Sequence, residues 1–379
     1  MAIALLFLVT LLVAYANGAN DNFKGVATLF GSDVTSYSGA IALGTIATLA
    51  GSLCSVFLAE ALVQTFSGKG LVPDAVALSP LFVLAVASAA AATIMLATRK
   101  GFPVSTTHAL VGALVGAGFI ASGTGLNLRA LGSTFFAPLI VSPLIAFALA
   151  ALLYRVTQSV LARKELDAQS CVCLGSMQWV PAVPSELPLG ARSFALAAPS
   201  AVGLQVAVGS AQACARRYSG SLLGVRLQSV FNGLHYLSVA AVSFARGLND
   251  TPKIIALLLV AHALDIRFGM VAGALAMASG GILNAQRVAQ TMSKRITRMD
   301  ETQALAANLI TAALVIFASR LGMPVSTTHV SVGAIGGVGL ARASVDRSVL
   351  GAILLSWLLT LPIAAFFGAA IYVIGHFIP

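Results

Sequence analysis

Long runs of uncharged apolar residues dominate the sequence and restrict its fold more than any other feature. A hydrocarbon core about 30 Å thick is crossed by about 20 apolar residues in a helix, and the chain supplies such runs from end to end. Apolar residues make up 58% of the chain and charged residues only 9%, against about 45–50% and about 25% in soluble domains. The runs are continuous and lack the alternation of a transmembrane β-barrel. The sequence therefore predicts an all-α polytopic membrane protein and excludes an ordinary soluble enzyme.

The runs group into two sets of five expected membrane segments. The first set comprises residues 1–16, 39–59, 80–98, 104–121 and 131–154. The second comprises residues 229–264 with an interruption near Gly247, 268–285, 303–319, 325–341 and 349–377. Because no Lys or Arg precedes the first run, we interpret it as a retained helix and not as a signal peptide. We expect three parts: a first transmembrane repeat (1–154), a central cytoplasmic loop (155–228) and a second transmembrane repeat (229–379).

Lys and Arg residues are distributed unequally between alternate connections. They concentrate at Arg99 and Lys100, in the central loop, in residues 287–298, and at Arg342 and Arg347. Since cytoplasmic loops carry the excess of basic residues, both termini are expected outside a plasma (inner) membrane. The net charge of +10 is thus interpreted as a topology signal, and the dispersed charges do not favour a nucleic-acid partner.

Two different motifs each occur twice, in the same order. Gly18-Ala19-Asn20-Asp21 matches Gly247-Leu248-Asn249-Asp250, and the run Pro-Val-Ser-Thr-Thr-His begins at both Pro103 and Pro324. Such self-similarity indicates a duplicated unit. With five segments per unit, the second copy would be inverted relative to the first. This is the plan of secondary transporters, whose substrate sites lie on broken helices and re-entrant half-helices near the midplane.

The duplicated Asn-Asp pairs place carboxylates inside otherwise apolar segments. Each charge there costs a few kcal/mol, so we expect Asp21 and Asp250 to face a polar cavity or an ion. Gly18 and Gly247 are expected to let the helix open beside them. Two buried structural aspartates are the alternative.

The Pro-Val-Ser-Thr-Thr-His runs predict an anion site at the start of a helix, where free amides and hydroxyls meet the positive end of the helix dipole. The hydroxyl donors are Ser105, Thr106 and Thr107 in the first repeat and Ser326, Thr327 and Thr328 in the second. Simple N-capping is the alternative interpretation. His108 and His329 end the two runs; they could shuttle protons or bind a neighbouring helix.

These motifs resemble those of the inorganic phosphate transporter family, which includes sodium- and proton-coupled permeases. The resemblance implies a phosphate site and cation coupling through the aspartates. The implied substrate-binding residues are Asn20, Asp21, Ser105, Thr106, Thr107, Asn249, Asp250, Ser326, Thr327 and Thr328.

The first motif departs from the family pattern because Lys24 stands where a second asparagine is usual, and Lys253 stands three residues after Asp250. A lysine three residues after an aspartate lies on the same helix face. Lys24 and Lys253 are therefore expected to pair with Asp21 and Asp250 and to replace sodium as the compensating charge. Lysines that extend to the membrane surface are the alternative.

We therefore expect a secondary active symporter for inorganic phosphate, with protons favoured over sodium as the coupling ion. A permease for sulfate or another tetrahedral oxyanion and an anion channel are the alternatives. No cluster of nucleophile and base or of metal ligands predicts an enzyme or a metal site, and no cofactor is expected. The expected partners are phosphate and membrane lipid, with a homodimer left open.

Overall fold

The computed structural model of the chain describes residues 2–31, 35–163, 170–176, 204–210, 223–260, 265–294, 301–341 and 347–377. The chain divides into two compact units, one of residues 1–154 and 235–379 and the other of residues 155–234. The chain leaves the first unit within α9 (Ala137–Arg163) and returns to it within α11 (Leu227–Ile255). Every residue that the sequence predicts for the site lies in the first unit.

The first unit is built from helices. Those before α9 are α1 (Ala2–Asp21), the 3-10 helix η1 (Asn22–Val26), α2 (Ala27–Gly31), α3 (Tyr37–Leu58), α4 (Glu60–Thr65), α5 (Asp74–Ala77), α6 (Pro80–Lys100), α7 (Thr106–Ser122), the 3-10 helix η2 (Gly123–Gly125), α8 (Leu128–Ala130) and the π-helix η3 (Leu131–Phe136). Those after α11 are the 3-10 helix η5 (Ala256–Val260), α12 (Ile266–Asn284), α13 (Gln286–Lys294), α14 (Glu301–Arg320), α15 (Thr327–Ala341) and α16 (Arg347–His376).

Among the described residues, eight helical segments are long and apolar enough to cross a membrane. They are residues 3–31, 37–58, 80–100, 106–125, 128–163, 266–284, 302–320 and 351–376. The other two of the ten expected segments are also helical, as α11 and α15. Helix α15 is only about 22 Å long at 1.5 Å per residue, which is shorter than the hydrocarbon core. The chain is a multi-pass helical membrane protein, as predicted.

The surface of the first unit carries large apolar side chains. Leu8 on α1, Phe57 on α3 and Leu358 on α16 are 62%, 80% and 70% exposed. The interior is made largely of alanine, glycine, serine and threonine, which allow helices to approach closely. This distribution suits a protein whose outer face contacts lipid.

Helix α7 packs backbone to backbone against α16. A Cβ atom added to Gly112 would lie 2.5 Å from Leu361 O, and one added to Gly116 would lie 1.9 Å from Ala365 O. These two glycines are four residues apart, the spacing that lets membrane helices cross closely. Helix α15 makes the corresponding contacts with α9 through Gly333 and Gly337.

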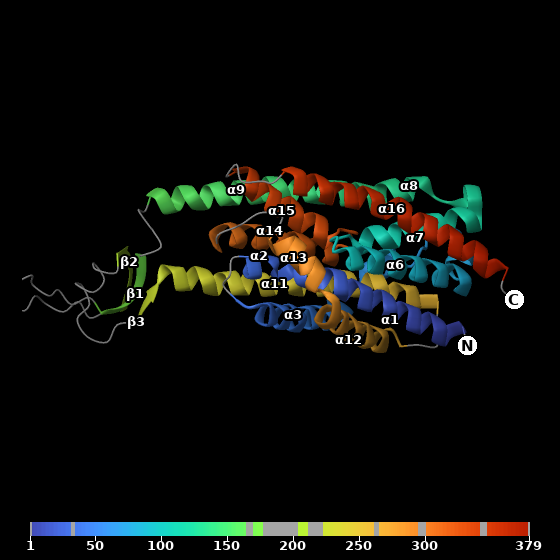
Figure 1. The fold of residues 1–379 in the computed structure, drawn as a ribbon, viewed down its shortest axis with the longest axis horizontal. Helices are drawn as coiled ribbons and strands as arrows, with labels where there is room; N and C mark the ends of the chain where they lie inside the picture. Colours follow the sequence, from blue (N-terminus) through green and yellow to red (C-terminus); the bar gives the residue numbers. More distant parts are fainter. Residues whose placement is uncertain are drawn as a thin grey trace, which may run out of the picture. The chain divides into compact units, whose positions relative to one another are not determined.

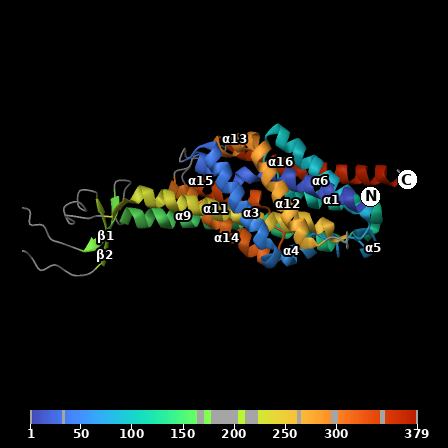
Figure 2. The same ribbon diagram turned by 90° about the horizontal axis from the view of Figure 1, so that it is seen from below.

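Within the first unit, several neighbouring helices are far apart in sequence. Helix α1 lies beside α12 and α6, α3 lies beside α12, and α16 lies beside α6 and α7 (Figures 1 and 2). Helix α1 begins and α16 ends at the same end of this unit in both views. The first and last parts of the chain therefore form one shared bundle.

The second unit contains a small antiparallel sheet. Its strands are β1 (Ser170–Ser176), β2 (Leu204–Ser210) and β3 (Leu223–Arg226), in the order β2-β1-β3. The register pairs Val172 with Val208 and with Val225. The sequence analysis predicted no strand in this segment, so the sheet adds a β element outside the all-α membrane region.

Candidate functional site

Two buried ion pairs lie at the centre of the first unit. Lys24 Nζ lies 2.5 Å from Asp21 Oδ1, and Lys253 Nζ lies 3.6 Å from Asp250 Oδ1. All four side chains are at least 95% buried. The predicted pairing of each aspartate with the lysine three residues later is confirmed. Buried charges of this kind are costly to desolvate and contribute little net stability, so their presence favours a functional role.

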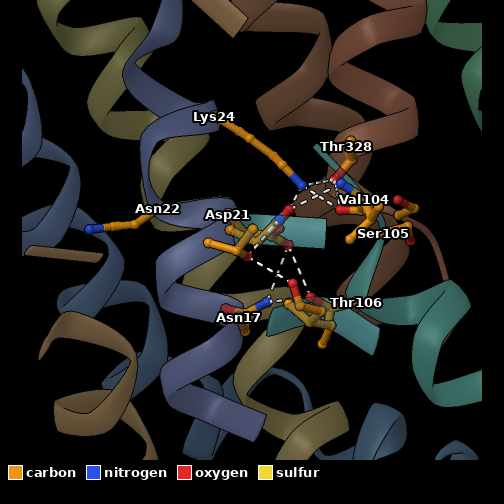
Figure 3. A network of polar contacts seen from close by, with 12 residues as sticks. Asn17, Asp21, Asn22, Lys24, Val104, Ser105, Thr106 and Thr328 are labelled. Carbon is orange, nitrogen blue, oxygen red and sulfur yellow. Dashed lines mark hydrogen bonds and ion pairs between the residues drawn. The ribbon is translucent and has the colours of Figure 1, made fainter. Parts of the chain in front are cut away.

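Each lysine also binds a threonine from the other part of the chain. Lys24 Nζ donates to Thr328 Oγ1 over 2.8 Å, and Lys253 Nζ donates to Thr107 Oγ1 over 2.9 Å. Figure 3 shows the Lys24 side chain reaching from its helix to Thr328 and Val104. The two ammonium groups thus connect the motifs that the sequence predicted for the site.

The backbone carbonyls of two valines complete both clusters. Lys24 Nζ donates to Val104 O, and Lys253 Nζ donates to Val325 O over 2.6 Å. Thr328 Oγ1 also donates to Val104 O, and Thr107 Oγ1 to Val325 O, over 3.2 Å each. Each carbonyl therefore accepts from the lysine of its own part of the chain and from a threonine of the other part.

The serines at the start of α7 and α15 cap these helices. Ser105 Oγ accepts from the backbone N–H of His108 over 3.1 Å, and Ser326 Oγ accepts from that of His329 over 3.3 Å. These contacts are those of ordinary N-cap residues. The N-capping alternative thus describes the hydroxyls of Ser105 and Ser326, but not those of the threonines at the lysines.

The threonines at positions 106 and 327 differ in their surroundings. Thr106 Oγ1 donates to Asp21 Oδ2 over 3.2 Å and accepts from Asn17 Nδ2 over 2.9 Å. Thr327 is 8% exposed, compared with 2% for Thr106. Thr106 therefore belongs to the hydrogen-bond network of Asp21 and Asn17.

The two motif asparagines hold the segments that precede α7 and α15. Asn20 Nδ2 donates to Thr98 Oγ1 and to Phe102 O over 2.9 Å each, and Asn20 Oδ1 accepts from Val104 N over 3.0 Å. Asn249 Nδ2 donates to Val325 O over 3.3 Å. Ser319 Oγ donates to Asn249 Oδ1 over 3.1 Å. Both asparagines thus contact the backbone that carries the valine carbonyls.

Helix α1 does not open at Gly18, contrary to our expectation. It remains α-helical to Asp21 and changes to a 3-10 helix at Asn22. Likewise, α11 continues past Gly247 to Ile255. The glycines serve close packing instead, because a Cβ on Gly18 would lie 1.8 Å from Met277 O of α12, and one on Gly247 would lie 2.1 Å from Thr48 O of α3.

Asn17 and Arg246 join the two aspartates into one network, and the sequence analysis assigned neither a function. Asn17 Nδ2 donates to Asp21 Oδ2 and to Asp250 Oδ2 over 3.2 Å each. Arg246 Nη1 donates to Asn17 Oδ1 over 3.0 Å. Figure 3 shows Asn17 beside Asp21 and Thr106, whereas Asn22 points away from them. A charged residue inside an apolar segment was the available signal for Arg246.

The two motif histidines face each other. The ring centroids of His108 and His329 are 4.2 Å apart, and the His329 ring stacks on Trp357 at 3.7 Å. His108 Nδ1 lies 3.1 Å from Ser105 Oγ. The ring contacts join α7, α15 and α16, whereas His108 bonds the serine at the start of its own helix and not the neighbouring helix that was expected.

Among the residues that the structure describes, no three His, Cys, Asp or Glu side chains are placed to hold a metal ion. The charged groups at the centre are instead two carboxylates, two ammonium groups and one guanidinium. Together with the threonine hydroxyls, they could bind an anion and exchange protons. The fold and this site define a membrane transporter with a buried polar centre.

Comparison with known proteins agrees with this class. The profile of the Phosphate transporter family matches residues 17–368, and the chain belongs to that family. It is 28% identical to a protein of Thermococcus kodakarensis provisionally named phosphate permease, over 96% of both chains. It is also 28% identical to the chloroplastic inorganic phosphate transporter 2-1 of Arabidopsis thaliana, over 93% of this chain and 68% of that one.

The fold resembles that of a solved structure titled the sodium-dependent phosphate transporter. The match covers 100% of both chains with a TM-score of 0.73 and 23% identity. The predicted resemblance to the phosphate transporter family is confirmed, and a transporter family, not an enzyme family, is established for the chain.

Proposed function

We propose that the protein is a secondary active symporter that binds inorganic phosphate between Thr107 and Thr328. The family supplies the substrate class, and one observation carries the position of the site. Each buried lysine bonds its own aspartate and a threonine of the other repeat. In the bound state, phosphate oxygens would accept from these ammonium and hydroxyl groups in place of the valine carbonyls.

The ten predicted ligands divide into three roles in this proposal. Thr106, Thr107, Thr327 and Thr328 contact the anion, while Asp21 and Asp250 hold the lysines and accept protons. Asn20, Asn249, Ser105 and Ser326 position the backbone that precedes and starts α7 and α15, because their hydrogen bonds are made to that backbone.

We further propose that residues 1–154 and 229–379 are inverted repeats joined by the central loop 155–228. Equivalent residues make equivalent contacts in both. Gly18 approaches Met277 O, and Gly247 approaches Thr48 O. Gly247 follows Gly18 by 229 positions and Met277 follows Thr48 by the same number, which is also the separation of Arg246 from Asn17. Such exchanged contacts are expected of two copies related by a pseudo-two-fold axis.

Two apolar cavities support the same symmetry. One, of about 350 Å³, lies between α6 and α16 beside Val104, and the other, of about 360 Å³, lies between α9 and α14 beside Val325. Most of their lining residues correspond, as Thr93 does to Leu314 and Phe102 to Met323. A duplicated unit accounts for this correspondence.

Protons are the coupling ion that the charges favour. Two unit charges of the same sign that lie 4 Å apart repel by about 4 kcal/mol, even at an effective dielectric constant of about 20. Two carboxylates and a phosphate placed together therefore need compensating positive charge. Here Lys24 and Lys253 already lie beside Asp21 and Asp250. A sodium ion is therefore not needed for compensation, and a proton on Asp21 or Asp250, or on phosphate itself, couples transport.

The proposed topology has both termini outside an inner membrane, as the Lys and Arg distribution predicts. The start of α1 and the end of α16 lie at the same end of the helical bundle, which agrees with an even number of membrane crossings. Lipid covers the exposed apolar faces, and a homodimer is the oligomeric form to test.

Phosphate uptake into proteoliposomes tests the function, with sodium and pH gradients imposed separately and sulfate as competitor. We expect uptake driven by an inward proton gradient without sodium and little competition by sulfate. Uptake driven by sodium alone would contradict the coupling, equal transport of sulfate would support the oxyanion alternative, and uptake insensitive to both gradients would support a channel.

A further inference from the structure

Arg246 is the charged group at the centre whose charge no carboxylate balances directly. Lys24 and Lys253 are each paired with an aspartate. Within the described part of the chain, no carboxylate lies within ion-pair distance of the Arg246 guanidinium, although the side chain is only 1% exposed. Asp250 lies one helical turn away but pairs with Lys253. The five buried charges therefore sum to one excess positive charge, carried by Arg246.

The hydrogen-bond capacity of this guanidinium is not filled. Arg246 Nη1 donates to Asn17 Oδ1 over 3.0 Å, and Arg246 Nη2 donates to Asn22 Oδ1 over 3.0 Å and to Thr48 Oγ1 over 2.9 Å. The buried Nε has no hydrogen-bond partner. Because an unsatisfied buried donor is costly, and because neutral oxygens supply all three contacts, the group is suited to accept an anion.

We propose that Arg246 is a phosphate-binding residue, which supplies the net positive charge and the directional donors for one anion. The inference rests on the proposed phosphate transport. The guanidinium fork matches two oxygens of a phosphate. Asn17, which bonds Arg246, also bonds Asp21, Asp250 and Thr106. An anion that replaces Asn17 Oδ1 at Arg246 would therefore lie beside both carboxylates and the start of α7.

The position of Arg246 also breaks the symmetry of the centre. Arg246 and Asn17 stand in equivalent places, each one residue before the glycine of its Gly-x-Asn-Asp motif. Equivalent residues would give the centre either two guanidinium groups or none. One arginine facing one asparagine gives a single excess charge, which accommodates one anion in one orientation.

Binding of radiolabelled phosphate to the purified protein tests this role. In Arg246→Gln the charge and the fork are lost, so we expect affinity to fall by about 10- to 150-fold, as for a hydrogen bond to a charged group. Arg246→Lys keeps a charge without the fork and is expected to bind with intermediate affinity. Uptake assays should show the loss as a raised KM with a smaller effect on the maximal rate.

Thr48→Val is the matched control, because it removes one hydrogen bond to Arg246 and leaves the guanidinium in place. Its phosphate affinity should stay within about threefold of the unmodified protein, because the guanidinium keeps its charge and its hydrogen bonds to Asn17 and Asn22 and the anion itself loses no partner. Gel filtration and thermal unfolding check that each variant is folded. If Arg246→Gln does not fold, the Lys variant decides, and unchanged affinity there overturns the proposal.

The outcomes separate this inference from the transport function. If the unmodified protein binds phosphate and folded Arg246→Gln binds it equally well, Arg246 is only a structural link between α11, α1 and α3, and the proposal is wrong. If the unmodified protein binds no phosphate at any pH or sodium concentration, the proposed function itself fails. An equal loss of affinity in Thr48→Val and Arg246→Gln would also overturn the proposal, because a structural link between α11 and α3 alone would then explain the effect.

Discussion

Lys24 Nζ donates a hydrogen bond of 2.8 Å to Thr328 Oγ1, a residue 304 positions later in the chain. Lys253 and Thr107 make the reciprocal contact over 2.9 Å. The centre is therefore assembled only when both parts of the chain are folded together, and each part supplies a cation to the other's hydroxyl.

Removing either threonine hydroxyl should weaken phosphate binding. In Thr107→Val or Thr328→Val, a buried phosphate oxygen and a lysine lose a partner, at a cost of about 1–3 kcal/mol, or about 5- to 150-fold in affinity. Equilibrium binding of labelled phosphate measures the change. Thr93→Val is the control, because the Thr93 hydroxyl bonds only its own helix at Ala89 O among the contacts described. Unchanged affinity in a folded Ser105→Ala, Thr106→Val, Thr107→Val triple variant would remove the first motif from the site.

Replacing the lysines should change the dependence on cations. In Lys24→Asn or Lys253→Asn, the carboxylate of Asp21 or Asp250 loses its ion pair. We expect phosphate affinity without sodium to fall by about tenfold or more, with partial recovery when sodium is added. Uptake measured over a series of sodium concentrations checks this. Lys100→Asn is the control, since Lys100 is exposed at the end of α6. Sodium-independent uptake of normal affinity in both variants contradicts the charge argument.

A methyl group at the crossing of α7 and α16 should destabilise the protein. In Gly116→Ala the new Cβ would lie 1.9 Å from Ala365 O, and only a shift of backbone can relieve this contact. We expect a loss of about 1–3 kcal/mol in the free energy of unfolding, as for overpacked cores. Thermal unfolding in detergent measures it. Gly351→Ala in α16 meets no atom within 4 Å and should be neutral or stabilising, so a similar loss in both variants would point to a different cause.

Labelling of single cysteines tests the orientation. In a background without the four native cysteines, Lys69→Cys should react with a membrane-impermeant reagent added outside, and Lys100→Cys only with reagent added inside. These positions lie before and at the end of α6, which is long enough to cross a membrane. The opposite pattern would invert the topology and contradict the Lys and Arg distribution behind it.

The sequence predicts the local part of the site better than the tertiary part. The Asp21–Lys24 and Asp250–Lys253 pairs follow from helix geometry, since residues three apart share a face. The contacts of Lys24 with Thr328 and of Lys253 with Thr107 depend on how distant segments pack, and no local pattern encodes them. The role of Gly18 was misjudged because a glycine inside a membrane helix serves a close crossing as readily as a break.

The sequence alone does not predict which residue Arg246 binds. Its spacing of four residues from Asp250 suggests an ion pair on one helix, yet the guanidinium binds Asn17 on α1. Lys253 occupies the Asp250 carboxylate instead. Competition between two cations for one carboxylate is decided by the surrounding helices and not by spacing.

The close helix crossings at glycines affect how the two halves of the chain fold together and which helices can move during transport. Gly18 of α1 meets the backbone of α12, and Gly247 of α11 meets that of α3, so each aspartate-bearing helix is fastened to a helix from the other half of the chain. If either half were synthesised alone, its glycine-bearing helix would lack the helix against which it packs. The two halves are therefore expected to be stable only when co-expressed. During a transport cycle, α1 with α12 and α11 with α3 would move as joined pairs, which leaves the segments before α7 and α15 as the parts free to open.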